Sequence, residues 1–147
     1  MKKVVSILIL SIILPFSYAH SGEPYVPKEN EEYYGTWVNE EYNNVDTYAK
    51  WVINSNGTWA GYDAVWLKDV PSSKGSFKII AKWKDQNGDV WYKTTWKNET
   101  WGQSGYGLIH ISDSGSTMEA AYDTLDFPTK IDPTKPWPSY LGIHHRQ

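Results

Sequence analysis

The chain has 147 residues, a formal net charge of −3 at pH 7 and no cysteine. This length suits one compact domain, the lack of cysteine excludes a disulfide framework and a thiol nucleophile, and the acidic balance argues against unspecific nucleic-acid binding. The nine Trp and 11 Tyr residues are well above a usual share. They favour strands, because aromatic side chains are enriched in sheets and bury a large area each.

The first 19 residues have the three parts of a secretory signal. Lys2 and Lys3 precede an apolar run over 4–14, and Ser17 and Ala19 supply the small residues expected before a cleavage site. The apolar run is too short to cross a bilayer as a helix, and no other stretch approaches the required length of about 20 apolar residues. We therefore expect cleavage after Ala19, a secreted or periplasmic location and no membrane span.

The organised part of the chain is expected to begin at Tyr33. Before it, Pro24, Pro27 and a run of Glu and Asn predict a flexible leader over 20–32. A first strand is predicted over 33–42, a turn over 43–46 and a second strand over 47–53. Asn56 and Gly57 then predict a hairpin turn into a third strand over 58–63, because Asn-Gly between β-prone runs is the strongest short hairpin signal.

The structure of 64–75 stays open, because proline, serine and glycine interrupt any pattern there. Strands over 76–84 and 89–97 flank a second Asn-Gly turn at 85–88. Period-two alternation assigns one set of side chains on these strands to the inner face: Phe77, Ile79, Ala81, Trp83, Val90, Tyr92, Thr94 and Trp96. The opposite, lysine-bearing set is predicted to lie outside: Lys78, Lys82, Lys84, Trp91, Lys93, Thr95 and Lys97.

Two further strands, over 105–112 and 116–123, are predicted on either side of Asp113-Ser114-Gly115, and one more strand is available near the C-terminus. The prolines of the tail over 124–147 exclude a regular helix and a central strand there. We expect this tail to pack on the barrel, with Trp137 and Tyr140 docked. Without a 3.6-residue period, the chain is predicted to be all-β: an antiparallel up-and-down meander over 33–123 that closes into a barrel of about eight strands. An open β-sandwich is the alternative.

A glycine two residues before a tryptophan in the first strand, Gly35-Thr36-Trp37, is followed by short strands joined by hairpins. This combination resembles the lipocalin superfamily, in particular the short lipocalin-like domains of exported bacterial proteins. The resemblance implies an eight-stranded barrel in which Trp37 packs at the closed end, under an arginine from a late strand. Arg146 is the only arginine of the chain. The expected partner of Trp37 is therefore either missing or supplied by the tail.

Catalytic motifs are absent from the sequence: it contains no Gly-x-Ser-x-Gly elbow, no His-Glu-x-x-His pair and no glycine-rich phosphate loop. The neighbouring carboxylates Glu119, Asp123 and Asp126 are interpreted as a solvated face. The four histidines, at 20, 110, 144 and 145, lack the spacing of a metal site, and His110 is interpreted as a structural or pocket-edge residue. We therefore expect a non-enzymatic protein without a cofactor or metal.

The aromatic residues are the feature that points to binding. An inward set is predicted to line the barrel and to hold a small hydrophobic ligand: Trp37, Phe77, Trp83, Tyr92, Trp96 and Tyr122. The alternative is a barrel filled by its own side chains, with outward aromatics that bind a glycan or a protein. That outward set is predicted to comprise Trp51, Trp59, Trp66, Trp91 and Trp101. The sequence leaves the identity of the ligand, the oligomeric state and the biological process open.

Overall fold

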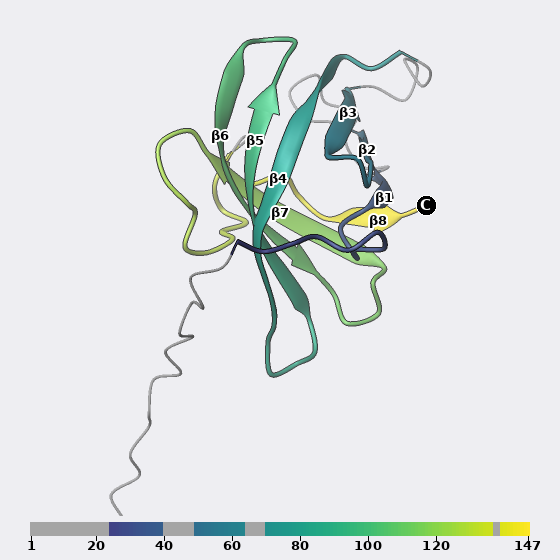
Figure 1. Ribbon diagram of the computed structural model, residues 1–147, viewed down its shortest axis with the longest axis vertical. Coiled ribbons are helices and arrows are strands. Elements are labelled where there is room, and N and C mark those ends of the chain that lie inside the picture. Colours follow the sequence, from purple (N-terminus) through teal and green to yellow (C-terminus); the bar gives the residue numbers. More distant parts are fainter. Residues whose placement is uncertain (1–23, 40–48, 64–69, 137–138) are drawn as a thin grey trace, which may run out of the picture.

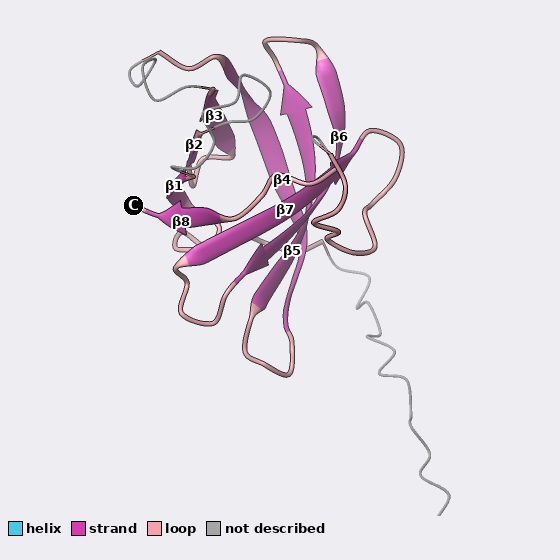
Figure 2. Ribbon diagram, turned by 180° about the vertical axis from the view of Figure 1, so that it is seen from behind, coloured by secondary structure: helices cyan, strands magenta, loops and turns pink. Residues whose placement is uncertain are grey.

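The fold is a closed barrel of antiparallel strands, seen in a computed structural model that describes residues 24–39, 49–63, 70–136 and 139–147 (Figure 1). The strands of these residues are β1 (Gly35–Val38), β2 (Lys50–Ile53), β3 (Thr58–Tyr62), β4 (Ser73–Lys84), β5 (Val90–Asn98), β6 (Gln103–Ile111), β7 (Thr117–Asp123) and β8 (His144–Arg146). Each strand pairs with the next along the chain, and β8 pairs with β1. The predicted all-β meander is thus confirmed, and the open sandwich is excluded. Figure 2 shows strands and loops, and no helix, in this described part.

The hairpins lie where the turn residues predict them. Gly57 and Gly88 have φ of 82° and 88°, the left-handed region that an Asn-Gly turn requires. Each turn is closed by backbone hydrogen bonds, such as Asp85 N–H to Asp89 O at 3.0 Å. β4 starts at Ser73, within the stretch that the sequence leaves open. The parts of the first two predicted strands that fall in 40–48, like Trp66, lie outside the described residues.

The tail closes the barrel. β8 pairs with β7 on one side and with β1 on the other. The expectation that the tail over 124–147 holds no central strand is therefore wrong for 144–146, because β8 begins only after the last proline of the tail. Ahead of it, Leu141 is buried, and its N–H donates to Ala120 O of β7 at 2.9 Å. Tyr140 docks on the wall as expected, since its hydroxyl donates to Glu119 Oε1 at 2.9 Å. Trp137 lies outside the described residues.

A β-bulge in β4 reverses four of the predicted side-chain directions. The register against β5 shifts between Ile79 and Ala81, so that Lys82 pairs with the fully buried Tyr92, and Trp83 pairs with Trp91. Residues paired across an antiparallel ladder share a face. Ala81 likewise pairs with the outward Lys93, and Lys84 pairs with the buried Val90. The inward predictions for Ala81 and Trp83 and the outward predictions for Lys82 and Lys84 are therefore wrong, because the extra residue of a bulge inverts the alternation that follows it.

The first-strand motif forms the contact that the lipocalin resemblance implies. Trp37 is fully buried, and its indole N–H donates to Tyr33 O at 3.0 Å. The Arg146 guanidinium lies 4.3 Å from the Trp37 ring centroid and donates to the backbone oxygens of Glu32, Tyr34 and Gly115. A methyl group on Gly35 would lie 2.8 Å from Arg146 Nη1. The arginine is thus supplied by the tail, and Gly35 leaves room for it.

Four aromatic residues on the inner face sit opposite glycines of a neighbouring strand. The direct cross-strand pairs are Trp51 with Gly61, Trp59 with Gly75, Trp96 with Gly105 and Tyr122 with Gly107. A glycine leaves the space into which the large ring across from it can lean. Trp51 and Trp59 are buried in the core, so the prediction that they face outward is wrong.

Gly75→Ala is expected to destabilise the barrel by about 3 kcal/mol, the upper range for overpacking a core. The new methyl group would lie 1.8 Å from the backbone oxygen of Lys97 and 2.8 Å from Trp59 Nε1, and the backbone contact cannot be relieved by a rotamer change. The urea midpoint measures the loss. Ser76→Ala, on the outer face of the same strand, should shift it little. Equal midpoints for the two variants would contradict this account of the Trp59 pair.

Candidate functional site

The interior of the barrel collects five of the six residues predicted to bind a ligand. Trp37, Phe77 and Tyr92 are buried in the core cluster, and the half-buried Trp96 and Tyr122 pack against it. The sixth residue, Trp83, lies on the outer face of β4 for the reason given above.

The interior rings touch one another in a continuous series. Tyr122 lies 6.4 Å from Trp51 and 5.8 Å from Trp96, both measured between ring centroids. Its hydroxyl oxygen is 3.4 Å from that of Tyr33, whose ring meets Phe77 edge-on at 5.3 Å. Such edge-to-face and tilted contacts are the favourable geometries for aromatic pairs. The inner surface is therefore largely aromatic, with a few hydroxyl groups at the ring ends.

Thr94 stands out in this interior. It lies on the inner face of β5, is almost completely buried, and its Oγ1 has no hydrogen-bond partner among the described residues. A buried hydroxyl without a partner is costly, and such groups are rare in folded proteins. A ligand with one polar group, or an ordered water molecule, would satisfy it.

One end of the barrel is closed by the segment before β1 through a cluster of charges. The Lys82 ammonium lies 2.7 Å from Glu31 Oε2 and 2.5 Å from Glu32 Oε2. The Tyr92 hydroxyl lies 2.6 Å from Glu32 Oε2 and accepts a bond from the Glu32 N–H, and Tyr25 donates to Glu31 Oε1. The Glu31 side chain is completely buried. Part of the segment treated as a leader in the sequence analysis thus makes specific contacts with the barrel.

These contacts shift the pKa values of the two carboxyl groups and of the Lys82 ammonium. Burial alone would raise the pKa of the Glu32 carboxyl, but hydrogen bonds from Lys82 and Tyr92 outweigh it and lower that pKa to about 2. The pKa of Glu31 is lowered in the same way, against the effect of burial. For Lys82, burial opposes the charge, yet bonds to both carboxylates raise its pKa above 10.5. All three groups are therefore charged at neutral pH.

The outer face of the sheet carries an aromatic row, defined here as Trp83, Trp91 and His110. The two indoles are nearly parallel, at 10°, with ring centroids 6.1 Å apart, and the His110 ring lies 4.5 Å from Trp91. All three side chains are half-buried. The outward prediction for Trp91 is confirmed.

Carboxylates border the aromatic row. Trp91 Nε1 donates to Asp85 Oδ2 at 2.9 Å. The two ring nitrogens of His110 face Asp89 Oδ2 at 2.8 Å and Glu119 Oε2 at 3.4 Å. His110 is held as a structural residue of this face, and the described residues contain no group of three or more His, Cys, Asp or Glu that could hold a metal ion.

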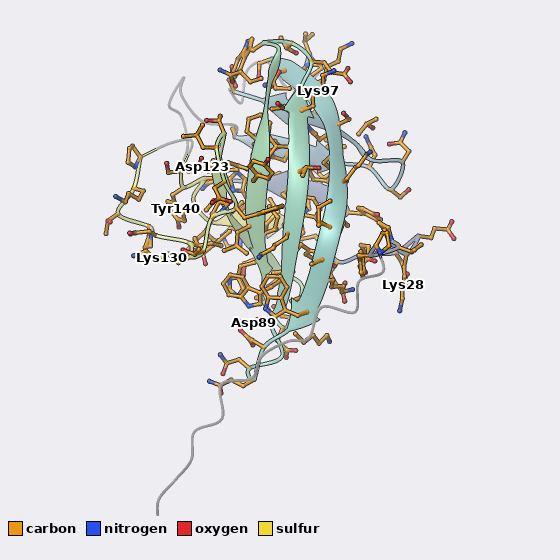
Figure 3. The ribbon with its side chains drawn as sticks, turned by 60° about the vertical axis from the view of Figure 1, so that its left-hand side comes forward. Lys28, Asp89, Lys97, Asp123, Lys130 and Tyr140 are labelled. Atoms are coloured by element: carbon orange, nitrogen blue, oxygen red, sulfur yellow. The ribbon has the colours of Figure 1, made fainter. Side chains whose placement is uncertain are left out.

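A groove of about 420 Å³ lies further along the same face, over β4, β5 and β6. Its lining combines lysines and hydroxyl residues from outward positions with two aromatic residues and a glycine: Ser76, Lys78, Thr95, Lys97, Ser104, Tyr106 and Thr124, with Phe77, Trp96 and Gly105. In Figure 3 this face is in front, with Asp89 near one end of the strands and Lys97 near the other.

These features define a class of protein, an eight-stranded antiparallel closed β-barrel with an aromatic interior. Comparisons of the chain with protein-family models, with curated proteins and with solved structures find no match. In the described ranges no helix is long and apolar enough to cross a membrane.

Sequence reasoning missed two parts of these sites. The pairing of Glu31 and Glu32 with Lys82 joins residues about 50 positions apart, and Lys82 carries no local mark of burial. A signal for the aromatic row was present, since Ile79 and Ile80 are consecutive apolar residues that break strict alternation. Such a break is what a bulge produces, and it would have placed Trp83 beside Trp91.

Proposed function

We propose that the protein is an exported, non-enzymatic, lipocalin-like protein that binds a small hydrophobic molecule inside the barrel. The observation that carries the proposal is the aromatic inner wall around the unpartnered Thr94 hydroxyl. Small-molecule sites combine apolar lining with a small number of placed polar groups, and this interior has both.

The aromatic inner surface of the barrel indicates which kind of ligand would fit. Flat aromatic surfaces favour an apolar ligand with a planar or extended body, because the contact energy comes from buried area and ring faces. A threonine hydroxyl can both donate and accept a hydrogen bond, so one carboxyl, hydroxyl or carbonyl group on the ligand would satisfy Thr94. Fatty acids, retinoids and haem are the classes to test first.

The closed end supports the lipocalin-like assignment. Gly35 and Trp37 match the glycine and tryptophan of the resemblance residue by residue, and Arg146 of the tail covers Trp37 where the resemblance implies an arginine. A closed end beneath an aromatic interior suits a barrel with one mouth. The signal sequence predicted over 1–19 supports export, and mass spectrometry of the secreted or periplasmic protein should find His20 as its first residue.

Ligand titration with tryptophan fluorescence tests the proposal on the mature protein. We expect saturable quenching by at least one of the three classes, because Trp37, Trp51, Trp59 and Trp96 all belong to or pack on the interior cluster. Thr94→Val should weaken that ligand about tenfold, the loss of one buried hydrogen bond. Without ligand, the Thr94→Val protein should be no less stable than the parent, because the substitution removes an unpartnered hydroxyl.

Thr95→Val is the matched control, since Thr95 lies one residue further on and lines the outer groove. It should leave the affinity for the interior ligand unchanged. Absence of saturable quenching with fatty acids, retinoids and haem alike would overturn the proposal. Equal effects of Thr94→Val and Thr95→Val would overturn the assigned role of Thr94.

A further inference from the structure

The outer face of β4, β5 and β6 has two further features, of which only the second shares residues, Phe77 and Trp96, with the interior wall. At one end lies the aromatic row of Trp83, Trp91 and His110, and at the other lies the polar groove. Both belong to the same sheet surface, visible from Asp89 to Lys97 in Figure 3. From Trp91 to Lys97 the strand advances six residues, which is about 20 Å at the usual rise per residue.

We propose that this face binds an oligosaccharide chain that carries carboxylate groups, with a sugar ring on the indoles and acidic sugars over the groove. The first argument is the bulge in β4. Without the register shift between Ile79 and Ala81, Lys82 would lie beside Trp91 and Trp83 would enter the core. Bulges are features that re-aim side chains, and this one turns a large apolar ring toward solvent.

The indoles form a fixed surface. Their planes differ by 10°, and the 6.1 Å between centroids means that neither ring fully covers the other. The Trp91 ring is held by its bond to Asp85 on one edge and by His110 alongside. Surfaces that are already ordered lose little conformational entropy on binding. The negatively polarised face of an indole attracts the C–H groups on one side of a sugar ring.

The polar groups around the indoles suit hydroxyl donors. Asp85, Asp89 and Glu119 each make a bond within the protein, and a carboxylate has acceptor sites for more than one partner. Sugar hydroxyls at the edge of a stacked ring can donate to these oxygens. An apolar partner would bury the carboxylates without such bonds, which is costly.

The groove supplies the opposite charge. Lys78 and Lys97 border it, and hydroxyl groups from Ser76, Thr95 and Ser104 line it between them. Ammonium groups favour carboxylates on the ligand, while hydroxyls can donate to or accept from sugar oxygens. The carboxylates beside the aromatic row would repel an acidic group. The charges therefore also set the direction of the bound oligosaccharide, with a neutral sugar at the indoles and acidic sugars at the lysines.

Affinity for two defined sugars tests the proposal, with oligogalacturonate as the acidic probe and cellohexaose as the neutral one. Calorimetry on the mature protein should find that oligogalacturonate binds more tightly than cellohexaose. Its affinity should fall as salt is added. Trp91→Ala and Trp83→Ala should each weaken it about tenfold or more, as central aromatic anchors do. Lys97→Met should reduce the preference for the acidic probe and leave cellohexaose unchanged.

Tyr62→Ala is the matched control, because it removes a half-buried ring from β3, where the Lys50 ammonium lies 4.0 Å from that ring. It should leave both sugars unaffected. Urea midpoints verify folding, and Trp91→Phe, which keeps a ring but loses the Asp85 bond, should give an intermediate affinity. If the protein bound neither sugar, or if Trp91→Ala and Tyr62→Ala lost equal affinity for them, the proposal would be overturned. Thr94→Val should not change sugar binding, so this outcome is independent of the interior ligand.

Discussion

Lys82→Met is expected to lower the free energy of unfolding at pH 7 by about 3 kcal/mol, the lower end of the cost of removing one partner from a buried ion pair. Methionine keeps an unbranched side chain, so the change mainly removes the ammonium group. The Lys82 side chain is 20% exposed and that of Glu31 is 0% exposed. The variant therefore leaves a buried carboxylate without its counter-ion, and urea denaturation measures the loss.

The effect of Lys82→Met should depend on pH with a definite sign. The pKa of Glu32 in the folded protein, about 2, lies below the ordinary value of 4.5. Its bonds to Lys82 therefore stabilise the fold fully above pH 4.5, and this contribution is lost as the pH falls from about 4.5 to about 2. In the variant this contribution is already absent, because no ammonium group faces the two carboxylates. The difference in stability between parent and variant should thus narrow over this pH range.

Lys78→Met is the control for Lys82→Met, because Lys78 is an exposed lysine on the outer face of the same strand. A surface substitution of this kind should change stability by no more than about 0.5 kcal/mol. Adding Glu31→Gln and Glu32→Gln to Lys82→Met should restore part of the loss, since no buried charge is then left unpaired. If Lys82→Met and Lys78→Met were equally stable at pH 7, the charged cluster would not hold the segment before β1 on the barrel.

Trp37→Ala is expected to cost about 4 kcal/mol, within the range for removing a large buried ring. Trp37 is fully buried, and the cavity would lie between the sheet and the Arg146 guanidinium. A loss of this size is a large fraction of the total stability of an ordinary domain. Part of the population should therefore unfold at 25 °C, which circular dichroism and the urea midpoint would detect.

Trp101→Ala makes the same chemical change on the turn between β5 and β6, where the side chain is 50% exposed. It should cost far less than Trp37→Ala. Trp37→Phe tests the hydrogen bond separately, because it keeps a ring but leaves Tyr33 O without the indole donor. Its stability should fall between those of the parent and Trp37→Ala. A Trp37→Ala variant as stable as Trp101→Ala would rule out a plug role for this indole.

Much of the strand pattern was predictable because its signals are local. Asn-Gly at 56–57 and 87–88 adopts the positive φ that its hairpins need, and β5 keeps strict alternation, with Val90, Tyr92 and Thr94 buried. The alternation of Met118 and Ala120 in β7 was equally legible. In each case a few neighbouring residues specify both the turn and the inner face.

Faces were predicted wrongly where the local pattern is ambiguous. Trp51 and Ile53 share one side of β2, and Trp59 and Gly61 share one side of β3, but the sequence does not show which side meets the core. Pairing Trp51 with Gly61 and Trp59 with Gly75 settles the question, because the glycine on the neighbouring strand leaves space for the ring on the inner face. That pairing exists only once the sheet is assembled.

The amino-acid sequence by itself determined the strands, their order as a meander and the burial of Trp37, since period-two hydrophobicity and turn chemistry act over a few residues. Only the tertiary structure decided that Arg146 covers Trp37, that Lys82 turns inward to Glu31 and Glu32, and that Trp83 turns outward to Trp91. The first two are contacts between residues some 50 to 110 positions apart, and the third depends on one residue inserted at a bulge. Closure of the barrel fixes all three, because only a complete set of neighbouring strands sets the register of each.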